Sequence, residues 1–215
     1  MSEEREVKFY LNHPAALEQR LLAAGARLLE GRVHEVNLRF DTPQGELTAA
    51  QRVLRLRQDR RARLTYKGPA QPGSEVAARE EIEFEVSDFD AARAFLEALG
   101  YQVSVMYEKY RTTYALPQVE VMLDEMPFGW FAEIEGHQAE EIRAAALVLE
   151  LRWEARCTAS YMALFERLKR RRNLTLTHLR FADLQGLSIT AADLELAAAD
   201  GEPNDRTQER GRHLD

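Results

Sequence analysis

The sequence predicts an α+β protein built around an eight-stranded antiparallel β-barrel, with helices packed on its outside. About eight segments in the first 136 residues alternate polar and apolar side chains with a period of two, as strands with one buried face do. Helical patterns follow only the first and the fifth of these segments, and most other connections are short turns. Many antiparallel strands with few helices are typical of a closed or nearly closed sheet.

The first third of the chain is expected to form strands around one helix. Pro14 suits the first turn of that helix, Leu17 and Leu21 share one of its faces, and Gly25 stops it. Two later alternating segments are separated by so few residues that they read as a hairpin. The predicted elements are a strand at 3–11, the helix at 13–26, a strand at 27–41, one helical turn at 46–51, and hairpin strands at 52–59 and 61–68.

The next part of the chain begins with a loop at 69–75 that is rich in Pro and Gly. A helix with an acidic first turn then ends at Gly100. Three strands after it are joined by short turns that contain Pro or Gly, so we expect an antiparallel meander. The predicted elements are a strand at 77–87, the helix at 88–100, strands at 103–116, 119–126 and 129–136, and helices at 139–153 and 158–172.

The length of 215 residues suits one domain with an appendage, or two small domains. We expect the domain to cover residues 1–172. Residues 173–198 have apolar side chains in short groups and predict a helical extension that caps the domain or contacts a partner. Residues 199–215 are polar and predict a disordered tail.

Composition narrows the class of protein. The net charge is -7, which disfavours a nucleic-acid or anionic-membrane partner because no global positive field would steer the chain there. The single cysteine, Cys157, excludes an internal disulfide, and the five histidines form no paired metal-binding motif. The N-terminus lacks the apolar region of a signal peptide, and no apolar run is long enough to span a membrane. A cytoplasmic protein is therefore expected.

Nearly every predicted strand carries a charged face. The first strand contains "EREVK", so Glu4, Glu6 and Lys8 share one face while Val7 lies on the other. On a single strand, a face wetted by solvent is the more common explanation. Here, however, carboxylates recur as E-x-E pairs on three strands, and cations recur as R-x-R or K-x-R on two. If the helices cover the apolar faces, the charged faces line an interior.

A barrel of about eight strands is large enough to hold one small ligand. Cations in its lining suit an anionic ligand, and clustered carboxylates suit hard divalent cations such as Mg²⁺ or Mn²⁺. Both together imply a polyphosphate carried with its metals. The basic candidates are Lys8, Arg55, Arg57, Lys67, Arg79, Lys109 and Arg111, and the acidic candidates are Glu4, Glu6, Glu81, Glu83, Asp124, Glu133 and Glu135. Such charges must pair with each other or with the ligand, since unpaired burial would be costly.

The order of the motifs adds a resemblance to a known family. The segments "EREVK", "LRLRQ", "TYKGP", "REEIEFEV", "EKYRTTY", "LDEMPFGWFAEIEG" and "SYMALF" follow one another along residues 3–170. In this order they resemble the CYTH family, the triphosphate tunnel metalloenzymes named for a class IV adenylate cyclase and thiamine triphosphatase. The resemblance implies an eight-stranded β-tunnel that binds a triphosphate together with Mg²⁺ or Mn²⁺, and we expect two such ions. Tyr161 matches a late tyrosine of the family, and core packing explains it equally well.

The resemblance also implies roles for the charged residues. Glu4 and Glu6 correspond to metal ligands, and Lys8 to a phosphate contact or a group near the attacking water, so Glu6 and Lys8 are the catalytic candidates. Arg79 is expected to contact phosphate or to orient Glu81. The implied phosphate clamps are Arg55, Arg57, Lys67, Lys109 and Arg111, and the implied further metal ligands are Glu81, Glu83, Asp124, Glu133 and Glu135, some of them acting through water.

The expected function is hydrolysis of a small inorganic or organic triphosphate, because water is always available and no base-specific pocket is required. One alternative is a class IV adenylate cyclase, in which a ribose hydroxyl of ATP attacks the α-phosphorus and pyrophosphate leaves. A second alternative is a non-catalytic polyphosphate- or nucleotide-binding module, which the full set of carboxylates disfavours. The sequence leaves open which triphosphate is used and whether the chain forms a homodimer.

Overall fold

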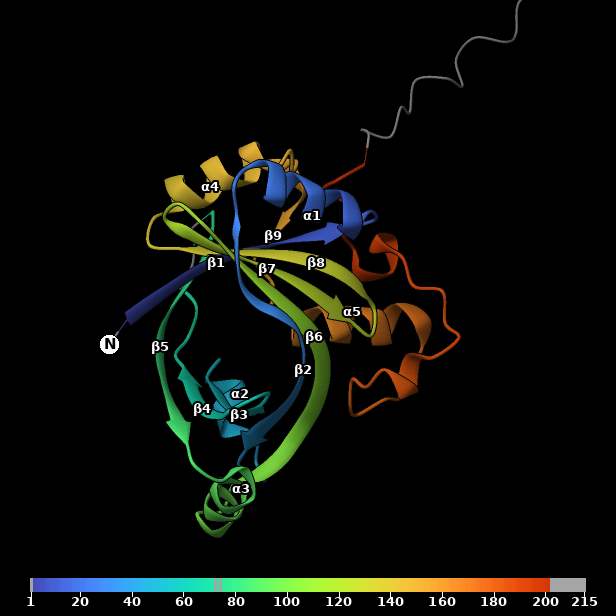
Figure 1. Ribbon diagram of the computed structural model, residues 1–215. Coiled ribbons are helices and arrows are strands. Elements are labelled where there is room, and N and C mark those ends of the chain that lie inside the picture. The colour runs from blue at the N-terminus through green and yellow to red at the C-terminus, as the bar shows by residue number, and fades with distance from the viewer. Residues whose placement is uncertain (1, 72, 74, 202–215) are drawn as a thin grey trace, which may run out of the picture.

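The computed structural model describes residues 2–71, 73 and 75–201, which form one large sheet with helices around it (Figure 1). The strands are β1 Ser2–Leu11, β2 Arg27–Asp41, β3 Val53–Gln58, β4 Ala62–Lys67, β5 Ala77–Val86, β6 Gln102–Leu116, β7 Val119–Met126, β8 Gly129–Gly136 and β9 Arg156–Cys157. The α-helices are α1 Pro14–Ala23, α2 Glu46–Ala49, α3 Phe89–Ala98, α4 Ala139–Val148 and α5 Tyr161–Arg172. Short 3-10 helices lie at Trp153–Ala155, Ala182–Leu184 and Ala191–Leu194.

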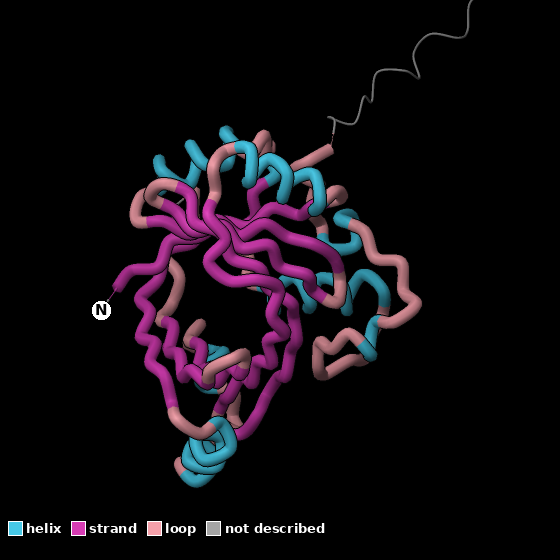
Figure 2. Tube along the Cα trace, viewed as in Figure 1, coloured by secondary structure: helices cyan, strands magenta, loops and turns pink. Residues whose placement is uncertain are grey.

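Eight of the strands close into a ring. Hydrogen-bonded neighbours follow the order β5-β4-β3-β2-β6-β7-β8-β1, and β1 returns to pair with β5. Every one of these pairings is antiparallel. Figure 2 shows the strands running around a common centre. The predicted fold class, α+β with a closed antiparallel sheet of eight strands, is confirmed.

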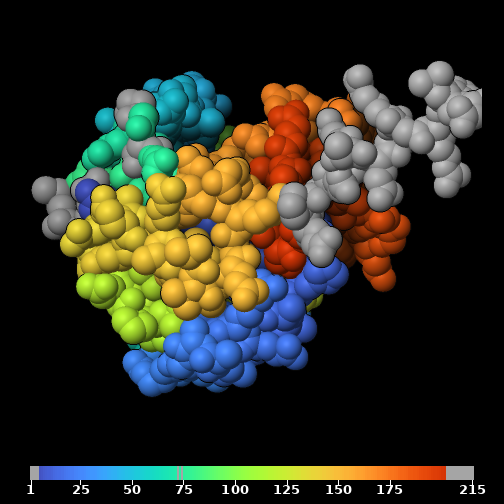
Figure 3. All heavy atoms as spheres, turned by 90° about the horizontal axis from the view of Figure 1, so that it is seen from above, coloured from blue at the N-terminus to red at the C-terminus, as the bar shows by residue number. Residues whose placement is uncertain are grey.

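The apolar faces of the strands point outwards. Helices α1 and α4, which lie side by side in the space-filling view (Figure 3), cover one side of the ring, whereas Ile82 and Phe84 of β5 are 43% and 54% exposed. Val7 of β1 and Ile134 of β8 share a buried cluster with Leu21 of α1 and Ile142 of α4. On the opposite side of the ring, Leu96 of α3 packs against β2 and β3. Because side chains alternate along a strand, the charged residues between the apolar positions point inwards. The outward packing thus determines what the interior contains.

Helix α5 is the exception, because it lies against one end of the inner face. Tyr10 of β1 and Phe131 of β8 have the same phase of alternation as the inward-facing charged residues, and they pack with Phe165 of α5. Tyr161 and Met162, at the start of α5, line the cavity inside the ring. The interior therefore has an aromatic end, where α5 sits, and a charged remainder.

The segment after α5 packs over this helix and is bound to the sheet by backbone bridges. Leu179 forms a parallel bridge with Tyr107 of β6, and Ala198 forms one with Tyr10 of β1. Leu179 is fully buried in the same apolar cluster as α5. The extension predicted at 173–198 thus packs over α5 and connects β6 to β1, mostly without helical structure of its own.

The first residues of the segment expected to form a disordered tail from residue 199 are packed against the domain. Ala199 is 1% exposed, and the carboxylate of Asp200 accepts hydrogen bonds from the backbone N–H groups of Asn12 and His13 at 2.8 and 2.6 Å. These contacts correct the predicted boundary at its first residues. The rest of the predicted tail, 202–215, lies outside the described residues.

Some element boundaries also differ from the prediction. The helix expected at 139–153 ends at Val148, and Glu150 takes a left-handed backbone conformation with φ of 55°. The helix expected from 158 begins at Tyr161, because the Ser160 side chain caps it by accepting from the N–H of Ala163. Strand β9 is only two residues long and was not predicted, since two residues carry no periodic signal. Among the described residues, no helix has the length and apolar character needed to cross a membrane.

Candidate active site

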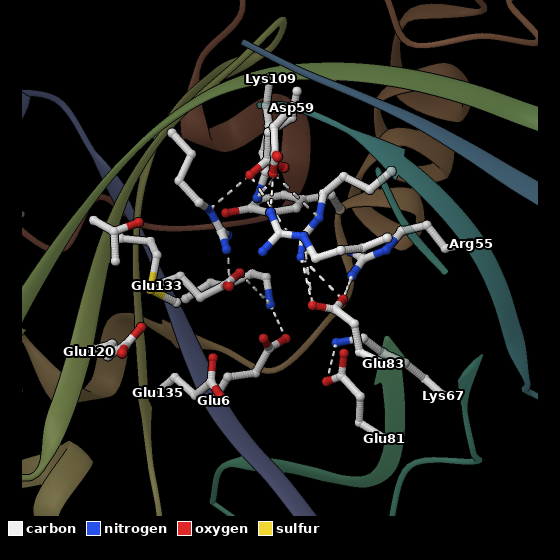
Figure 4. A pocket seen from close by; sticks show the side chains of 18 of the residues that line it. Glu6, Arg55, Asp59, Lys67, Glu81, Glu83, Lys109, Glu120, Glu133 and Glu135 are labelled. Carbon is white, nitrogen blue, oxygen red and sulfur yellow. Dashed lines mark hydrogen bonds and ion pairs between the residues drawn. The ribbon is translucent and has the colours of Figure 1, made fainter. Parts of the chain in front are cut away.

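The ring encloses a cavity of about 1470 Å³. Its lining includes every charged residue singled out from the sequence except Asp124, which is buried just behind it, and Glu4, whose side chain is outside the described residues. Among the described residues of this lining, Lys and Arg outnumber Asp and Glu. Figure 4 shows these side chains converging from different strands, with Glu6, Glu120, Glu133 and Glu135 on one side and Arg55, Lys67, Glu81 and Glu83 on the other. The charged faces of the strands therefore point into the ring, as the alternation along the strands predicted.

One wall is formed by β1, β7 and β8 and is rich in carboxylates. In the strand register Glu6 lies opposite Glu135, and Lys8 lies opposite Glu133. The Lys8 ammonium is ion-paired with Glu6 and, at 3.2 Å, with Glu133. Burial opposes the charge of Lys8, but Glu133 and Glu6 outweigh burial and raise its pKa, so Lys8 is an ammonium at neutral pH. Glu120, on β7 opposite Glu135, extends this wall towards solvent.

The opposite wall is formed by β3, β4 and β5 and is rich in arginine. Arg57 contacts both oxygens of Glu83 at 3.1 Å, and Arg55 reaches Glu83 at 3.4 Å. The Thr65 hydroxyl donates to Glu83 at 2.7 Å, while Lys67 pairs with Glu81 at 3.1 Å. Glu81 and Glu83 therefore neutralise cations of their own wall in this structure.

Asp124 lies at the base of the site and is completely buried. Arg111 binds it with two N–H groups at 2.6 Å, Lys109 donates at 3.1 Å, and the Tyr161 hydroxyl donates at 2.7 Å. Both oxygens are thus occupied, and the carboxylate holds two cations in place. Burial and the nearby Asp124 raise the pKa of Tyr161, so its hydroxyl stays protonated and acts as a donor.

Glu35 of β2 belongs to the site although the sequence analysis did not single it out. It is 2% exposed and lies 3.5 Å from Lys109, 3.8 Å from Arg57 and 4.0 Å from Arg111. Burial disfavours its charge, but Lys109, Arg111 and Arg57 outweigh burial and lower the pKa of Glu35 to about 2. Strand β2 has no E-x-E or R-x-R repeat around Glu35, so only the alternation of the strand could have pointed to it.

The metal ligands inferred from the resemblance do not form a ready-made metal centre. Among the residues that the structure describes, no three His, Cys, Asp or Glu side chains gather in a group able to hold a metal ion. Glu6 and Glu133 are paired with Lys8, and Asp124 is saturated by its donors. Glu4 belongs to the same face of β1 as Glu6, but its side chain is outside the described residues and is not counted among these groups.

The comparison with protein families decides the identity of this architecture. The CYTH domain matches residues 2–160, which is most of the chain. The chain belongs to the CYTH family. The expected family membership is thereby confirmed, and the extension that straps α5 lies beyond the matched region.

Solved structures share the CYTH fold. A proposed adenylate cyclase from Vibrio parahaemolyticus is 23% identical, with a TM-score of 0.68 over 76% of this chain and 97% of that one. The PH1012 protein of Pyrococcus horikoshii is 25% identical, with a TM-score of 0.63 over 74% and 97%. A protein from Hippeastrum, first proposed as an adenylyl cyclase and described as having a dominant triphosphatase activity, is 20% identical, with a TM-score of 0.56 over 77% and 95%. No functionally curated protein was found to match the chain.

Proposed function

We propose that this CYTH protein is a metal-dependent hydrolase of small triphosphates. The observation that carries the proposal is the pair of opposed walls: carboxylates of β1 and β8 face arginines and a lysine of β3, β4 and β5 across one cavity. Phosphoryl transfer needs positioning and neutralisation of charge more than covalent help from the protein. A cavity with cations on one wall and oxygen donors on the other supplies both.

The carboxylates of Glu6, Glu133 and Glu135, with Glu4, are the groups that would hold Mg²⁺ or Mn²⁺. Carboxylate oxygens are the ligands that these hard cations prefer, and three of the four side chains line the cavity on one wall. Bound metal would polarise phosphate oxygens and lower the pKa of a bound water. The pairing of Lys8 with Glu6 and Glu133 supports this assignment, because it shows that the wall already attracts a cation.

The phosphate groups would be held by the cations of the other walls. Arg57, Lys109 and Arg111 surround Glu35, and Lys67 pairs with Glu81, so each cation is aimed into the cavity by a carboxylate behind or beside it. Arginine can bind two phosphate oxygens at once. Lys8 would contribute positive charge near the scissile bond rather than accept a proton, because it is already an ammonium.

Product analysis tests the function. Purified protein with Mg²⁺ or Mn²⁺ would be given tripolyphosphate, ATP and thiamine triphosphate in separate reactions. We expect release of inorganic phosphate from at least one of them. Cyclic AMP with pyrophosphate from ATP would instead support the cyclase that the sequence left open, and binding without any turnover would support a non-catalytic module.

The first prediction concerns Glu6. We expect Glu6→Ala to lower metal-dependent phosphate release by more than about 100-fold, since losing a direct metal ligand should exceed the 10–100-fold cost of losing an outer-shell partner. The matched control is Glu140→Ala, which removes the same group from the exposed first turn of α4. Both proteins would be checked for an unchanged fold by circular dichroism. Normal turnover in folded Glu6→Ala would contradict the assignment of this wall to the metals.

A further inference from the structure

Strand β5 closes the ring along only its first half. From Ala77 to Glu81 it pairs with β1, whose first described residue, Ser2, lies opposite Glu81. Residues 82–86, called here the β5 edge, pair with β4 on one side, and in the described part of the chain no strand pairs with them on the other side. An unpaired strand edge presents backbone N–H and C=O groups on which a further strand can form.

The outer face of the β5 edge is apolar and uncovered. Ile82 and Phe84 are exposed, whereas Ala77 and Ala78, in the half of the strand that pairs with β1, are buried. Proteins usually protect a free strand edge with charged or proline residues that discourage pairing. The outward side chains of this edge are large and apolar instead, which favours contact with another chain over contact with water.

Helix α3 extends this apolar surface. It packs on the same buried cluster as Leu64 and Val86, the neighbours of Phe84 across the sheet and along the strand. Figure 1 shows β5 ending next to this helix. Phe95 and Leu99 lie one turn apart on α3, and both are more than half exposed. Exposed apolar side chains of two elements therefore border one cluster.

The apolar area suits one partner of an ordinary protein–protein interface. A large aromatic side chain buries about 150–250 Å² in full, so four large apolar side chains at roughly half exposure offer on the order of 400 Å². A standard interface buries about 800 Å² on each partner, and a polar rim surrounds its apolar core. The surface around β5 and α3 can therefore supply the core, with the strand edge and the rim supplying the remainder.

A second copy of the same strand is complementary to the β5 edge. Two copies of residues 82–86 that pair antiparallel about a two-fold axis place Phe84 opposite Phe84 and Ile82 opposite Val86. The apolar side chains of both copies then share one face, because side chains alternate along a strand. Each free edge is satisfied by the other. A different partner would have to bring an extended segment with the same alternation.

The carboxylates on the inner face of the β5 edge are compatible with this pairing. Glu83 would lie opposite Glu85 of the partner subunit, and like charges in that position are unfavourable. Each carboxylate is already paired within its own chain, however, since Arg57 contacts Glu83 at 3.1 Å and Arg61 contacts Glu85 at 2.5 Å. A basic partner peptide would have to displace these pairs, whereas a second copy brings its own.

We propose that the β5 edge and the apolar surface beside it form the contact between two copies of this chain, paired antiparallel about a two-fold axis at Phe84. The homodimer that the sequence left open thereby receives a defined interface. The contact uses the outer face of the ring and leaves the cavity of each copy within its own strands. The inference is therefore independent of the proposed function.

Sedimentation velocity over a wide range of protein concentration tests the dimer on the full chain. We expect the wild type to pass from monomer to dimer as its concentration rises. Phe84→Lys should raise the dissociation constant at least tenfold, because it places two ammonium groups opposite each other on the axis. Leu147→Lys makes a matched change at an exposed leucine of α4 and should alter the constant less than threefold.

Hydrogen exchange tests the strand pairing on the wild type. The backbone amides of residues 82–86 should exchange more slowly at high protein concentration than after dilution, while those of α4 should not change. A wild type that stays monomeric at every concentration overturns the proposal, and so does a dimer that folded Phe84→Lys leaves intact. A dimer without protection of 82–86 overturns it as well, and this measurement decides if the variant does not fold.

Discussion

Two buried carboxylates, Glu35 and Asp124, determine where the central cations of the cavity lie. Asp124 holds Arg111 and Lys109 through hydrogen bonds, and Glu35 lies within 4.0 Å of both and of Arg57. Glu35 lies on β2, outside the wall assigned to the metals. Asp124 lies on β7, which belongs to that wall, but Arg111 and Lys109 already occupy its oxygens. Breaking a buried pair by removing one partner leaves the other charge uncompensated, which is strongly destabilising. These two residues are therefore best understood as positioning groups.

The pKa of Glu35 leads to a prediction about acid stability. Because its pKa is lowered from 4.5 to about 2 on folding, Glu35 stabilises the protein above about pH 4.5, and this contribution is lost as the pH falls towards 2. We expect Glu35→Gln to be less stable at pH 7, by at most about 3 kcal/mol. The difference from the wild type should shrink between pH 4.5 and 2, as measured by urea unfolding across this range.

The control for Glu35 is Glu140→Gln, which neutralises an exposed carboxylate of α4. It should follow the wild-type curve within about 0.5 kcal/mol at every pH. A Glu35→Gln variant whose deficit is the same at pH 3 and pH 7 would show that its effect comes from packing rather than from charge.

The hydroxyl of Tyr161 gives a second prediction at this scale. It donates to the buried Asp124 at 2.7 Å, so Tyr161→Phe should lower the free energy of unfolding by about 1–2 kcal/mol. Tyr110→Phe removes a hydroxyl from a half-buried ring on β6 that contacts the rings of His34 and Phe181, and it should change stability by less than about 0.5 kcal/mol. Equal effects of the two substitutions in urea unfolding would argue against the hydrogen bond as the cause.

The residues of the site were predictable where a pattern repeats. The E-x-E and R-x-R spacings identified Glu6, Glu133 and Arg55 as candidates, because alternation along a strand places both members of such a pair on the same face. Glu35 was not found in this way, because no second carboxylate lies two residues before or after it on β2. Tyr161 of α5 also donates to Asp124, and such a contact between distant elements leaves no local signal in the sequence.

At the scale of elements, strands were easier to predict than the segment after α5. Eight strands have the period of two that burial of one face imposes, and their positions follow from it. The extension is held instead by two isolated bridges, at Leu179 and Ala198, and by the Asp200 cap. Backbone bridges do not depend on side-chain pattern, so the sequence could indicate short helices there but not the path of the chain.

The packing of the extension after α5 leads to a prediction about stability. Leu179 is fully buried between β6 and α5, so Leu179→Ala should lower the free energy of unfolding by about 2–5 kcal/mol. Leu187→Ala is the matched control, because that leucine lies in the same extension and is 49% exposed. It should change stability by less than about 0.5 kcal/mol. If both variants unfold at the same urea concentration, the extension contributes nothing through this contact.

At the scale of the whole molecule, the distribution of charge differs between inside and outside. The chain has a net charge of -7, while Lys and Arg outnumber Asp and Glu along the described lining of the cavity. The acidic surplus therefore lies elsewhere, chiefly on exposed surface. A concave site of one sign focuses its field and concentrates ligands of the opposite sign. The composition argued only against a nucleic-acid or anionic-membrane partner, and a basic cavity inside an acidic protein is compatible with that argument.

Enclosing cations in one cavity should couple folding to anion binding, which leads to the last prediction. A ligand that binds the folded chain alone stabilises it by about 2.7 kcal/mol at 100 times its dissociation constant. We expect tripolyphosphate to raise the melting temperature in EDTA, without metal, and the shift to grow with the logarithm of its concentration. Sodium sulfate at matched ionic strength is the control, and it should give a much smaller shift, since surface screening does not require a site. Equal shifts from the two salts would mean that the opposed walls do not act as a polyphosphate site.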